Sequence, residues 1–242
     1  MKTNPTQPRK PLVAVIIPAF KEERNITTIL DVLHRTDIAN EIILVDDGSP
    51  DRTAEIMQEF SKNDARMHVI RHETNKGKGQ AIFTGWAATT APYIIMLDAD
   101  LKNLHPEQIA ALIEPIINHR ADMTLGLFLG GHIHTDFAHW ATPFLTGQRG
   151  LRSDLLNHVS REASAGYGFE VALTIAAGKE DYRTRIVPLR GVWHPPSEFH
   201  RGLWFGVKMR ARMYGQIIRA WYIATRERYP KMRDLFSSIT KP

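Results

Sequence analysis

The sequence feature that most limits the fold is a repeated alternation of short apolar runs with amphipathic segments. Three runs stand out, namely Leu12–Pro18 (LVAVIIP), Glu41–Asp47 (EIILVDD) and Tyr93–Asp98 (YIIMLD). They are apolar at consecutive rather than alternate positions, which is typical of strands buried on both faces of a parallel sheet. Segments with helical spacing separate the strands, with a repeat of about 25–30 residues. The sequence therefore predicts an α/β fold with a mostly parallel sheet flanked by helices.

The remaining elements follow from periodicity and from turn residues. We expect helices over 26–35, 51–63, 77–89, 106–118, 148–160 and 169–178, strands over 68–71, 123–128 and 183–189, and a long helical stretch over 202–228. No repeat or strong internal linker interrupts this series. We therefore expect a flexible leader (1–11), one domain in two halves (12–128 and 129–195) and a C-terminal helical extension (196–242).

Composition narrows the class of protein. The chain has 242 residues, of which 43% are hydrophobic and 24% charged, which is typical of a globular protein rather than of a disordered chain, collagen or a coiled coil. The absence of cysteine excludes disulfides, thiolate zinc sites and a cysteine nucleophile. No run reaches the ~18 apolar residues of a spanning helix, and the polar N-terminus has no signal core. These features predict a cytoplasmic protein whose membrane contact is peripheral.

The charge is unevenly distributed along the chain. Residues 1–189 hold 20 Lys/Arg against 23 Asp/Glu, a net of −3, whereas residues 190–242 hold 11 against 3, a net of +8. A basic end of this kind suits phosphate, nucleic acid or an anionic membrane surface. Within it, several basic side chains share one face of the expected helix, opposite a face with aromatic residues. We predict contact with the membrane or a lipid acceptor for Lys208, Arg212, Arg219 and Trp221, the alternative being packing of the apolar face on the domain.

Acidic residues follow the predicted strands. Ligands of open α/β sheets bind at the carboxyl ends of the strands, so side chains there are expected to converge. Asp98 and Asp100 (DAD) directly follow one strand and present two hard oxygen ligands, which suits Mg²⁺ or Mn²⁺ with phosphate oxygens. The alternative is a solvated acidic turn. Asp46 and Asp47 follow another strand and either accept hydrogen bonds from a nucleoside or form an ordinary turn.

Basic residues provide candidate phosphate sites. Lys78 lies in NKGKGQ, a Gly-rich segment that opens a helix, where free backbone N–H groups favour anions. The letters match neither a Walker loop nor a dinucleotide-binding fingerprint. Arg149 and Arg152 lie three residues apart in the helix expected over 148–160, which would place both guanidinium groups on one face for phosphate binding. Otherwise they are surface charges.

Two further groups of residues could take part in chemistry. Glu170, in GYGFE, either acts as a general base or only complements the positive end of a helix. His132, His134 and His139 share one loop, for which a lid is the preferred interpretation over a metal site. His194 follows a strand and is either a structural histidine or a third metal ligand beside the two aspartates. The motifs of hydrolase triads and zincin proteases do not occur in the chain.

Five motifs in register resemble one enzyme family. IIPAFKEERNI, VDDGSPDRT, NKGKGQAIFTGW, DADL and TGQR have the order and spacing of family 2 glycosyltransferases with the GT-A fold, over about residues 12–175. The resemblance is closest to polyprenyl-phosphate (dolichyl-phosphate) sugar synthases. GYGFE, DADL and a downstream histidine are also similar to glucosyl-3-phosphoglycerate synthases.

The resemblance implies roles for individual residues. Pro18, Ala19, Phe20 and Glu22, together with Asp46 or Asp47, would hold the nucleoside of a nucleotide-sugar donor, and Lys78 would lie near its phosphates. Asp98 and Asp100 would form the DXD pair, with Asp100 binding Mn²⁺ or Mg²⁺ across the diphosphate. Arg149 would bind the leaving-group or acceptor phosphate, and Arg152 would lie on the acceptor side. The implied activity is sugar transfer to a lipid phosphate or another lipid, by an inverting displacement.

The sequence departs from the family pattern at two places. The polyprenyl-phosphate synthases usually have DADLQ, whereas Lys102 stands here in place of the glutamine. A lysine does not ligate a metal but could pair with phosphate, which raises the interest of His194 as a ligand. There is also no clear acidic pair to mark a catalytic base. An acceptor that is already a phosphate anion needs none, whereas a hydroxyl acceptor does, for which Glu170 is the candidate.

Three alternatives compete with this interpretation. One is a soluble and retaining glycosyltransferase with a small phosphorylated acceptor such as 3-phosphoglycerate. Another is a non-enzymatic nucleic-acid binder, which explains the basic end but not the acidic strand ends, so we expect no nucleic-acid partner. The last is a nucleotidyltransferase, which usually needs a basic Gly-rich loop after the first strand, where this chain has 18–25.

Overall fold

The computed structural model describes residues 12–130, 146–164, 168–195 and 215. The strands are β1 (Val13–Ala19), β2 (Glu41–Asp46), β3 (Met67–Arg71), β4 (Tyr93–Met96), β5 (Met123–Leu129), β6 (Arg149–Arg152) and β7 (Thr184–Arg190). The helices are α1 (Ile26–His34), α2 (Thr53–Ser61), α3 (Lys78–Ala87), α4 (Pro106–Ile117) and α6 (Gly168–Lys179), with a 3₁₀ helix, η2 (Ser153–His158). Within the described residues the predicted α/β class is confirmed, and most element boundaries lie within two residues of those expected.

The seven strands form one mixed sheet in the order β3-β2-β1-β4-β6-β5-β7. The pairs β1–β2, β2–β3, β1–β4 and β5–β7 are parallel. β6 is antiparallel to both of its neighbours, β4 and β5. After β1 the chain adds β2 and β3 on one side and then crosses to β4 on the other, so the strand order reverses between β1 and β4. Open sheets bind ligands at such a reversal.

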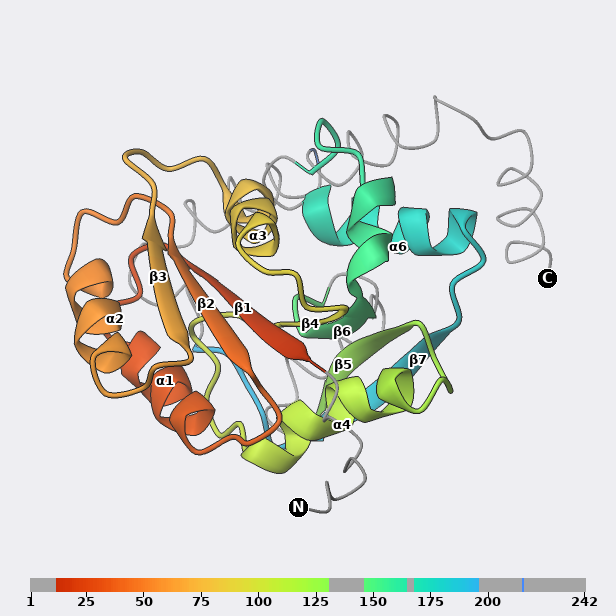
Figure 1. Ribbon diagram of the computed structural model, residues 1–242, viewed down its shortest axis with the longest axis horizontal. Coiled ribbons are helices and arrows are strands. Elements are labelled where there is room, and N and C mark those ends of the chain that lie inside the picture. The colour runs from red at the N-terminus through yellow and green to blue at the C-terminus, as the bar shows by residue number, and fades with distance from the viewer. Residues whose placement is uncertain (1–11, 131–145, 165–167, 196–214, 216–242) are drawn as a thin grey trace, which may run out of the picture.

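Two apolar cores cover the two faces of the sheet (Figure 1). Alternate residues of β1 point to opposite faces, so that Val13, Val15 and Ile17 join one core while Ala14 and Ile16 join the other. Helices α1, α2 and α4 pack in the first core, and α3 and α6 in the second. This two-sided burial explains why β1 and β2 are apolar at consecutive positions.

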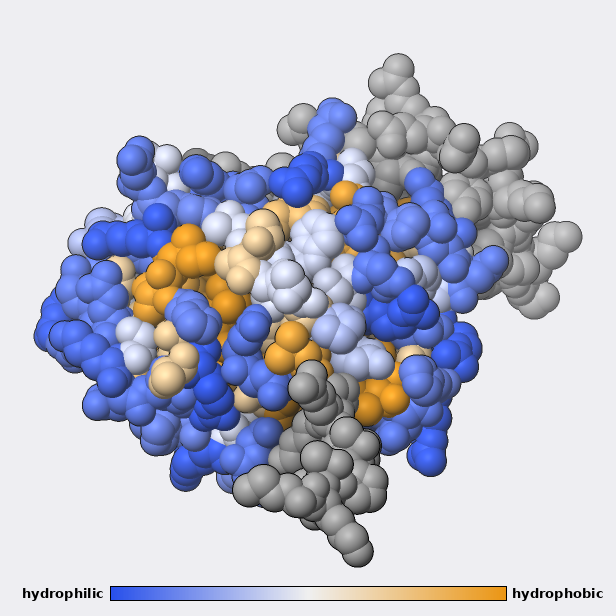
Figure 2. Space-filling view, viewed as in Figure 1, coloured by the Kyte–Doolittle hydropathy of each residue, from blue (hydrophilic) through white to orange (hydrophobic). Residues whose placement is uncertain are grey.

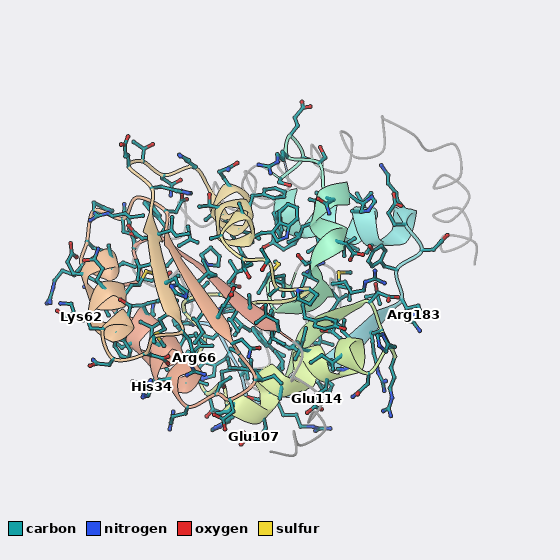
Figure 3. The ribbon with its side chains drawn as sticks, in the orientation of Figure 1. His34, Lys62, Arg66, Glu107, Glu114 and Arg183 are labelled. Carbon is teal, nitrogen blue, oxygen red and sulfur yellow. The ribbon has the colours of Figure 1, made fainter. Side chains whose placement is uncertain are left out.

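A cluster of charged residues around Arg66 closes the C-terminal end of α1. The Arg66 guanidinium donates hydrogen bonds to the carbonyl oxygens of Leu33 (3.3 Å) and His34 (3.0 Å) at the end of α1, and it pairs with Asp64 at 2.7 Å. Figure 3 shows Arg66 and His34 close together at this place. The cluster around Arg66 is therefore structural.

Figure 2 shows a mostly hydrophilic surface on the side of the molecule that faces the viewer, with smaller apolar areas between the helices.

The prediction of a helix over 148–160 is wrong. Arg149–Arg152 is the strand β6, which inserts between β4 and β5 with Met96 opposite Arg149 and Leu125 also opposite Arg149. Only the following segment is helical, as the short 3₁₀ helix η2. The pairing with two distant strands decides the conformation, because backbone ladders on both sides outweigh local propensity.

Several predictions concern residues that lie outside the described part. They include the leader (1–11), the histidine loop with His132, His134 and His139, and the basic extension with Lys208, Arg212, Arg219 and Trp221. In the residues that the structure describes, no helix is long and apolar enough to cross a membrane.

Candidate active site

A pocket of about 570 Å³ opens where the strand order reverses, at the carboxyl ends of β1, β2 and β4. Its lining includes nine of the residues named from the sequence, namely Pro18, Ala19, Phe20, Glu22, Asp47, Lys78, Asp98, Asp100 and His194. Asn75, Gly77, Ala99 and Pro195 complete the lining. Apart from Asp46, the strand-end side chains that were expected to converge therefore do so in one pocket.

Asp98, Asp100 and His194 form a compact group of possible metal ligands. One ligand atom from each lies within 4.8 Å of the others. His194 Nδ1 lies 2.8 Å from Asp100 Oδ1, and His194 Nε2 lies 3.8 Å from Asp98 Oδ2. Burial lowers the pKa of His194, but the hydrogen bond to Asp100 and the two carboxylates outweigh it and raise the pKa overall. Two carboxylates and an imidazole within this distance are a donor set that fits Mn²⁺ or Mg²⁺.

Lys78 links this group to the helix α6. Its Nζ lies 2.6 Å from Asp98 Oδ1 and 2.6 Å from Glu170 Oε1. Burial disfavours the charge on Lys78, but the two carboxylates outweigh burial and raise the pKa of Lys78. Burial likewise raises the pKa of Asp98, yet Lys78 and His194 hold that pKa below its usual value. The pocket thus carries a fixed ammonium group beside an ionised aspartate.

Gln148 is a site residue that the sequence did not reveal. Its side chain is fully buried, and its Nε2 donates a hydrogen bond to Asp98 Oδ2 at 2.9 Å. The Thr146 hydroxyl lies 2.9 Å from Gln148 Oε1 and fixes the direction of the amide. Gln148 precedes β6, whose antiparallel direction brings its first residue, Arg149, opposite Met96 at the end of β4. Only this pairing marks Gln148, because nothing in the letters TGQR points to Asp98.

Gly147 permits the close approach of this segment to the site. A Cβ at residue 147 would lie 2.5 Å from Lys78 Nζ and 2.6 Å from Asp98 Oδ2. Both distances are far below van der Waals contact, so any side chain would displace the ion pair. The glycine therefore leaves the room that the ion pair between Lys78 and Asp98 occupies.

Asp46 and Asp47 have different places in the structure. Asp46 is fully buried, accepts a hydrogen bond from the Ser49 N–H and pairs with Arg71 at 3.2 Å, and it does not line the pocket. Asp47 lines the pocket, where it accepts hydrogen bonds from the Lys76 and Gly77 N–H groups at 2.9 and 2.7 Å. Asp47 therefore fixes the loop that leads into α3 and Lys78.

The structure corrects the role predicted for Arg149. Arg149 was expected to bind phosphate, but its side chain is fully buried and absent from the pocket lining. Its guanidinium donates to the carbonyl oxygens of Thr146 (2.9 Å) and Glu170 (3.1 Å). Burial lowers the pKa of Arg149 to about 10, which the nearby Glu170 carboxylate partly opposes. Arg149 therefore ties β6 to the start of α6.

Arg152 lies at the other end of β6, beside the start of β4 and away from the pocket. It pairs in register with Tyr93, the first residue of β4, and its guanidinium contacts Asp154 at 2.5 Å and Asp122 at 3.6 Å. Because β6 is a strand, residues three apart point to opposite faces, so Arg149 and Arg152 cannot share a face as they would in a helix. Arg152 therefore does not line the pocket with Asp98 and Asp100, and its acceptor-side role stays a prediction.

Three other charged side chains were named from the sequence, namely Glu170, Lys102 and Glu22. Glu170 lies at the start of α6, is buried, and is held in the ion pair with Lys78. Lys102 was expected to be available to phosphate, but its Nζ donates to Thr28 Oγ1 of α1 at 3.2 Å. Glu22 lines the pocket, where burial raises its pKa to about 7, opposed by a hydrogen bond from Asn25 and assisted by Asp100 and Asp98.

Known proteins with similar sequences transfer sugars. The undecaprenyl-phosphate 4-deoxy-4-formamido-L-arabinose transferase of Pseudomonas aeruginosa is 39% identical over 111 residues, which are 43% of this chain and 32% of that protein. The UDP-N-acetylglucosamine–dolichyl-phosphate N-acetylglucosaminyltransferase of Methanococcus voltae is 35% identical over 130 residues, 48% of this chain and 51% of that protein. The chain thus spans about a third and a half of these two relatives.

Solved structures share the fold. Glucosyl-3-phosphoglycerate synthase from Mycobacterium tuberculosis, in complex with Mn²⁺, UDP-glucose and phosphoglyceric acid, has a TM-score of 0.69 and 22% identity. The similarity covers 88% of this chain and 79% of that one. Another structure of that synthase contains Mg²⁺ and UDP. The sequence model of "Glycosyl transferase family 2" matches residues 14–173. With this match over most of the chain, and with the fold and pocket described above, the protein belongs to glycosyl transferase family 2.

Proposed function

We propose that this glycosyltransferase is metal-dependent and moves a sugar from a nucleotide-sugar donor, of the UDP-glucose or GDP-mannose type, to a polyprenyl phosphate or another lipid acceptor. The reaction would take place at the cytoplasmic face of a membrane and invert the anomeric carbon. The observation that carries the proposal is that Asp98, Asp100, His194 and Lys78 line one pocket together with the loop after β1. The two relatives act on undecaprenyl phosphate and dolichyl phosphate, which supports a lipid-phosphate acceptor.

The donor would bind between the end of β1 and the start of α3. The surface of Pro18, Ala19 and Phe20 offers an apolar wall for the nucleoside, and Glu22 offers a carboxyl group to its hydroxyls. Phe20 is 37% exposed, which leaves its ring accessible to a base. The diphosphate would then lie near Lys78, whose ammonium group attracts the charge that develops on the leaving group.

Asp98, Asp100 and His194 would hold Mn²⁺ or Mg²⁺. A divalent ion bound there neutralises negative charge on the leaving diphosphate. Lys78 holds Asp98 ionised, and Gln148 fixes the direction of its second oxygen, so these two residues prepare the site before the donor arrives. The described residues thus supply both the acidic ligands and the groups that orient them.

The acceptor determines whether a base is needed. In the proposed displacement an acceptor phosphate oxygen forms a bond to the anomeric carbon, while the bond from that carbon to the donor phosphate breaks and its electron pair leaves with the diphosphate. A phosphate anion has no proton to lose, which agrees with the Glu170 carboxylate being occupied by Lys78 at 2.6 Å. A hydroxyl acceptor such as 3-phosphoglycerate would instead require a proton acceptor, and Glu170 would be that group.

The soluble alternative is supported by the shared fold of the Mycobacterium tuberculosis synthase, whose structure contains phosphoglyceric acid. One experiment compares the two. Thermal shifts with UDP, GDP, CDP and dTDP sugars, each with and without Mn²⁺, would identify the donor, and transfer to undecaprenyl phosphate, dolichyl phosphate and 3-phosphoglycerate would identify the acceptor. We expect a Mn²⁺-dependent shift with one base and product only with a lipid phosphate.

The outcomes are distinct. Product only with 3-phosphoglycerate would replace the lipid acceptor by the alternative. The absence of both shift and product with every donor would contradict the proposal. Flotation of the full chain with anionic vesicles checks the membrane contact, which we expect to weaken when Lys208, Arg212 and Arg219 are changed to glutamine.

A further inference from the structure

The position of His194 depends on contacts far away in the sequence. It lies 94 residues after its hydrogen-bond partner Asp100 and four residues after the end of β7. The described segment 168–195 ends one residue later, at Pro195. Besides its own contacts with Asp100 and with the Phe128 ring, His194 is therefore held beside the aspartates through the contacts of residues 190–193.

Residues 190–193 are bound to the loop that follows Asp100 and to the first turn of α4. Lys102 and Trp193 exchange two backbone hydrogen bonds, of 3.0 and 3.3 Å. The Asn103 side-chain amide donates to the Gly191 carbonyl oxygen at 3.1 Å, and the Gln108 amide donates to that of Arg190 at 2.9 Å. We call these four hydrogen bonds the clamp. The clamp joins the segment that carries Asp98 and Asp100 to the segment that carries His194.

The backbone at the clamp is shaped for these contacts. Asn103 has φ +58° and Gly191 has φ +75°, both in the left-handed region. Asparagine tolerates this region better than most residues with a side chain. A Cβ at residue 191 would lie 3.0 Å from Asn103 Nδ2. Glycine at 191 therefore lets the amide of Asn103 approach the backbone that it binds.

We propose that Asn103 and Gln108 are positioning residues that hold His194 at the metal site through the clamp. The inference rests on the proposed metal dependence of the enzyme. Both hydrogen bonds are exposed, so they add little to the stability of the apolar core, yet they act on the chain within four residues of a ligand. Residues that orient a metal ligand typically change metal affinity 10–100-fold when they are removed.

The test measures Mn²⁺ alone, without donor or turnover. Binding of Mn²⁺ to the full chain is followed by electron paramagnetic resonance, which detects the free ion. Asn103→Gly removes the amide while accepting the left-handed backbone. Gln108→Glu removes the donor to Arg190 but keeps the oxygen that accepts a hydrogen bond from the His105 N–H. We expect about 10-fold weaker Mn²⁺ binding for Asn103→Gly, and weaker binding still for the double variant.

Asn157→Ala provides a matched control. Its amide also donates to a backbone carbonyl, that of Asp154, at 3.1 Å in an exposed place away from the pocket. We expect unchanged Mn²⁺ affinity for this variant. An equal loss of affinity in Asn157→Ala and Asn103→Gly would overturn the proposal, because it would mean a general effect on the fold.

A double-mutant cycle with His194→Ala separates positioning from a structural role. If the clamp acts through His194, then Asn103→Gly must lose its effect on Mn²⁺ affinity in the His194→Ala background. An undiminished effect in that background contradicts the clamp, as does full affinity in Asn103→Gly itself. If the wild-type enzyme transfers sugar with Mn²⁺ but binds no Mn²⁺ in the absence of donor, the proposed role of the clamp is overturned and the proposed function stands. If the wild-type enzyme transfers sugar from no donor, the proposed function itself is overturned.

Discussion

The two halves of the domain build the site in different ways. Residues 12–130 bring their contribution at the ends of parallel strands, so that Glu22, Asp47 and Asp98 lie directly after β1, β2 and β4. Residues 146–195 contribute from an antiparallel strand, a helix and an edge strand, through Gln148, Glu170 and His194. Most of the named side chains of the first half face the pocket, whereas in the second half His194 faces it and Gln148 and Glu170 hold Asp98 and Lys78 in place.

This difference has a physical cause. Parallel strands joined by helices all end at one edge of the sheet, so any polar residue after a strand reaches that edge. β6 runs the other way, so the residue before its start, Gln148, rather than a residue after its end contacts Asp98. The contrast predicts that loss of a metal-ligand carboxylate of the first half, such as Asp100, abolishes activity, whereas changes at Gly147 and Gln148 in the second half reduce it by misplacing Asp98.

The largest expected effect is that of Asp100→Ala. It removes a carboxylate from the group of three possible metal ligands and the partner of His194. We expect kcat/KM to fall about 1,000-fold or more, since a charge that stabilises the transition state is lost. Steady-state kinetics at saturating Mn²⁺ measure it, and Asp31→Ala on the exposed side of α1 is the control. Full metal-dependent activity in Asp100→Ala would contradict the proposed site.

Gly147→Ala tests the second half with a single methyl group. The added Cβ would meet Lys78 Nζ at 2.5 Å and Asp98 Oδ2 at 2.6 Å, so we expect about a 100-fold lower kcat/KM from the displaced ion pair. Gly178→Ala is the control, because nothing lies within 4 Å of that Cβ and alanine favours a helix. Equal activity of the two variants would show that the space around Asp98 is not critical.

Gln148→Met should have a smaller effect. It removes the hydrogen bond to Asp98 Oδ2 but fills the buried volume, and the Thr146 hydroxyl retains the Gly126 carbonyl as a partner at 2.7 Å. We expect about 10-fold weaker Mn²⁺ binding, with a lower kcat, because one oxygen of Asp98 is no longer oriented. Calorimetric titration and kinetics measure these quantities, with exposed Gln58→Met as the control. Unchanged Mn²⁺ affinity would assign Gln148 to packing alone.

Glu22→Gln should have the smallest effect. We expect this effect in the pH dependence of the free energy of unfolding. The pKa of Glu22 is raised from 4.5 to about 7 in the folded protein, chiefly by burial. Below pH 4.5 Glu22 is protonated in both the folded and the unfolded protein, and its contribution to the free energy of unfolding is fully present. This contribution falls as the pH rises, until the pH has passed through about 7. After discounting for partial exposure, the loss is about 1 kcal/mol.

Denaturant unfolding of the metal-free protein at pH 5 and pH 8 tests this prediction. Glu22→Gln stays neutral, so it should lose this part of the pH dependence, while Glu59→Gln on the exposed side of α2 should keep it. Identical pH profiles for the wild type and Glu22→Gln would contradict the raised pKa.

The parts of the fold that the sequence predicted are those that depend on local pattern. The apolar runs of β1, β2 and β4 predict strands buried on both faces, and helical spacing predicts α1, α3 and α4. The helix expected over 148–160 failed because β6 gains its conformation from two strands that lie more than 20 residues earlier in the chain. Periodicity over a short window contains no information about such partners.

The candidate site divides in the same way. Asp98 and Asp100 could be named because they follow a strand, and His194 could be considered as their third partner. Arg149 was wrongly assigned to phosphate. In the folded protein its guanidinium is enclosed by the carbonyl oxygens of Thr146 and Glu170, and a short sequence motif gives no sign of this burial. Gln148 was missed for the opposite reason, since an uncharged amide acquires its role only from what it touches.

The sequence by itself therefore determined the α/β class, the strands that end at the pocket and the acidic residues placed there. These follow from rules that act within about ten residues, namely burial of apolar runs and the position of polar residues after them. Only the tertiary structure decided that Lys78 joins Asp98 to Glu170, that Gln148 orients Asp98, and that Asn103 and Gln108 bind the segment before His194. Hydrogen bonds and ion pairs act over about 3 Å, and only the folded chain brings residues 50 to 90 positions apart to that distance.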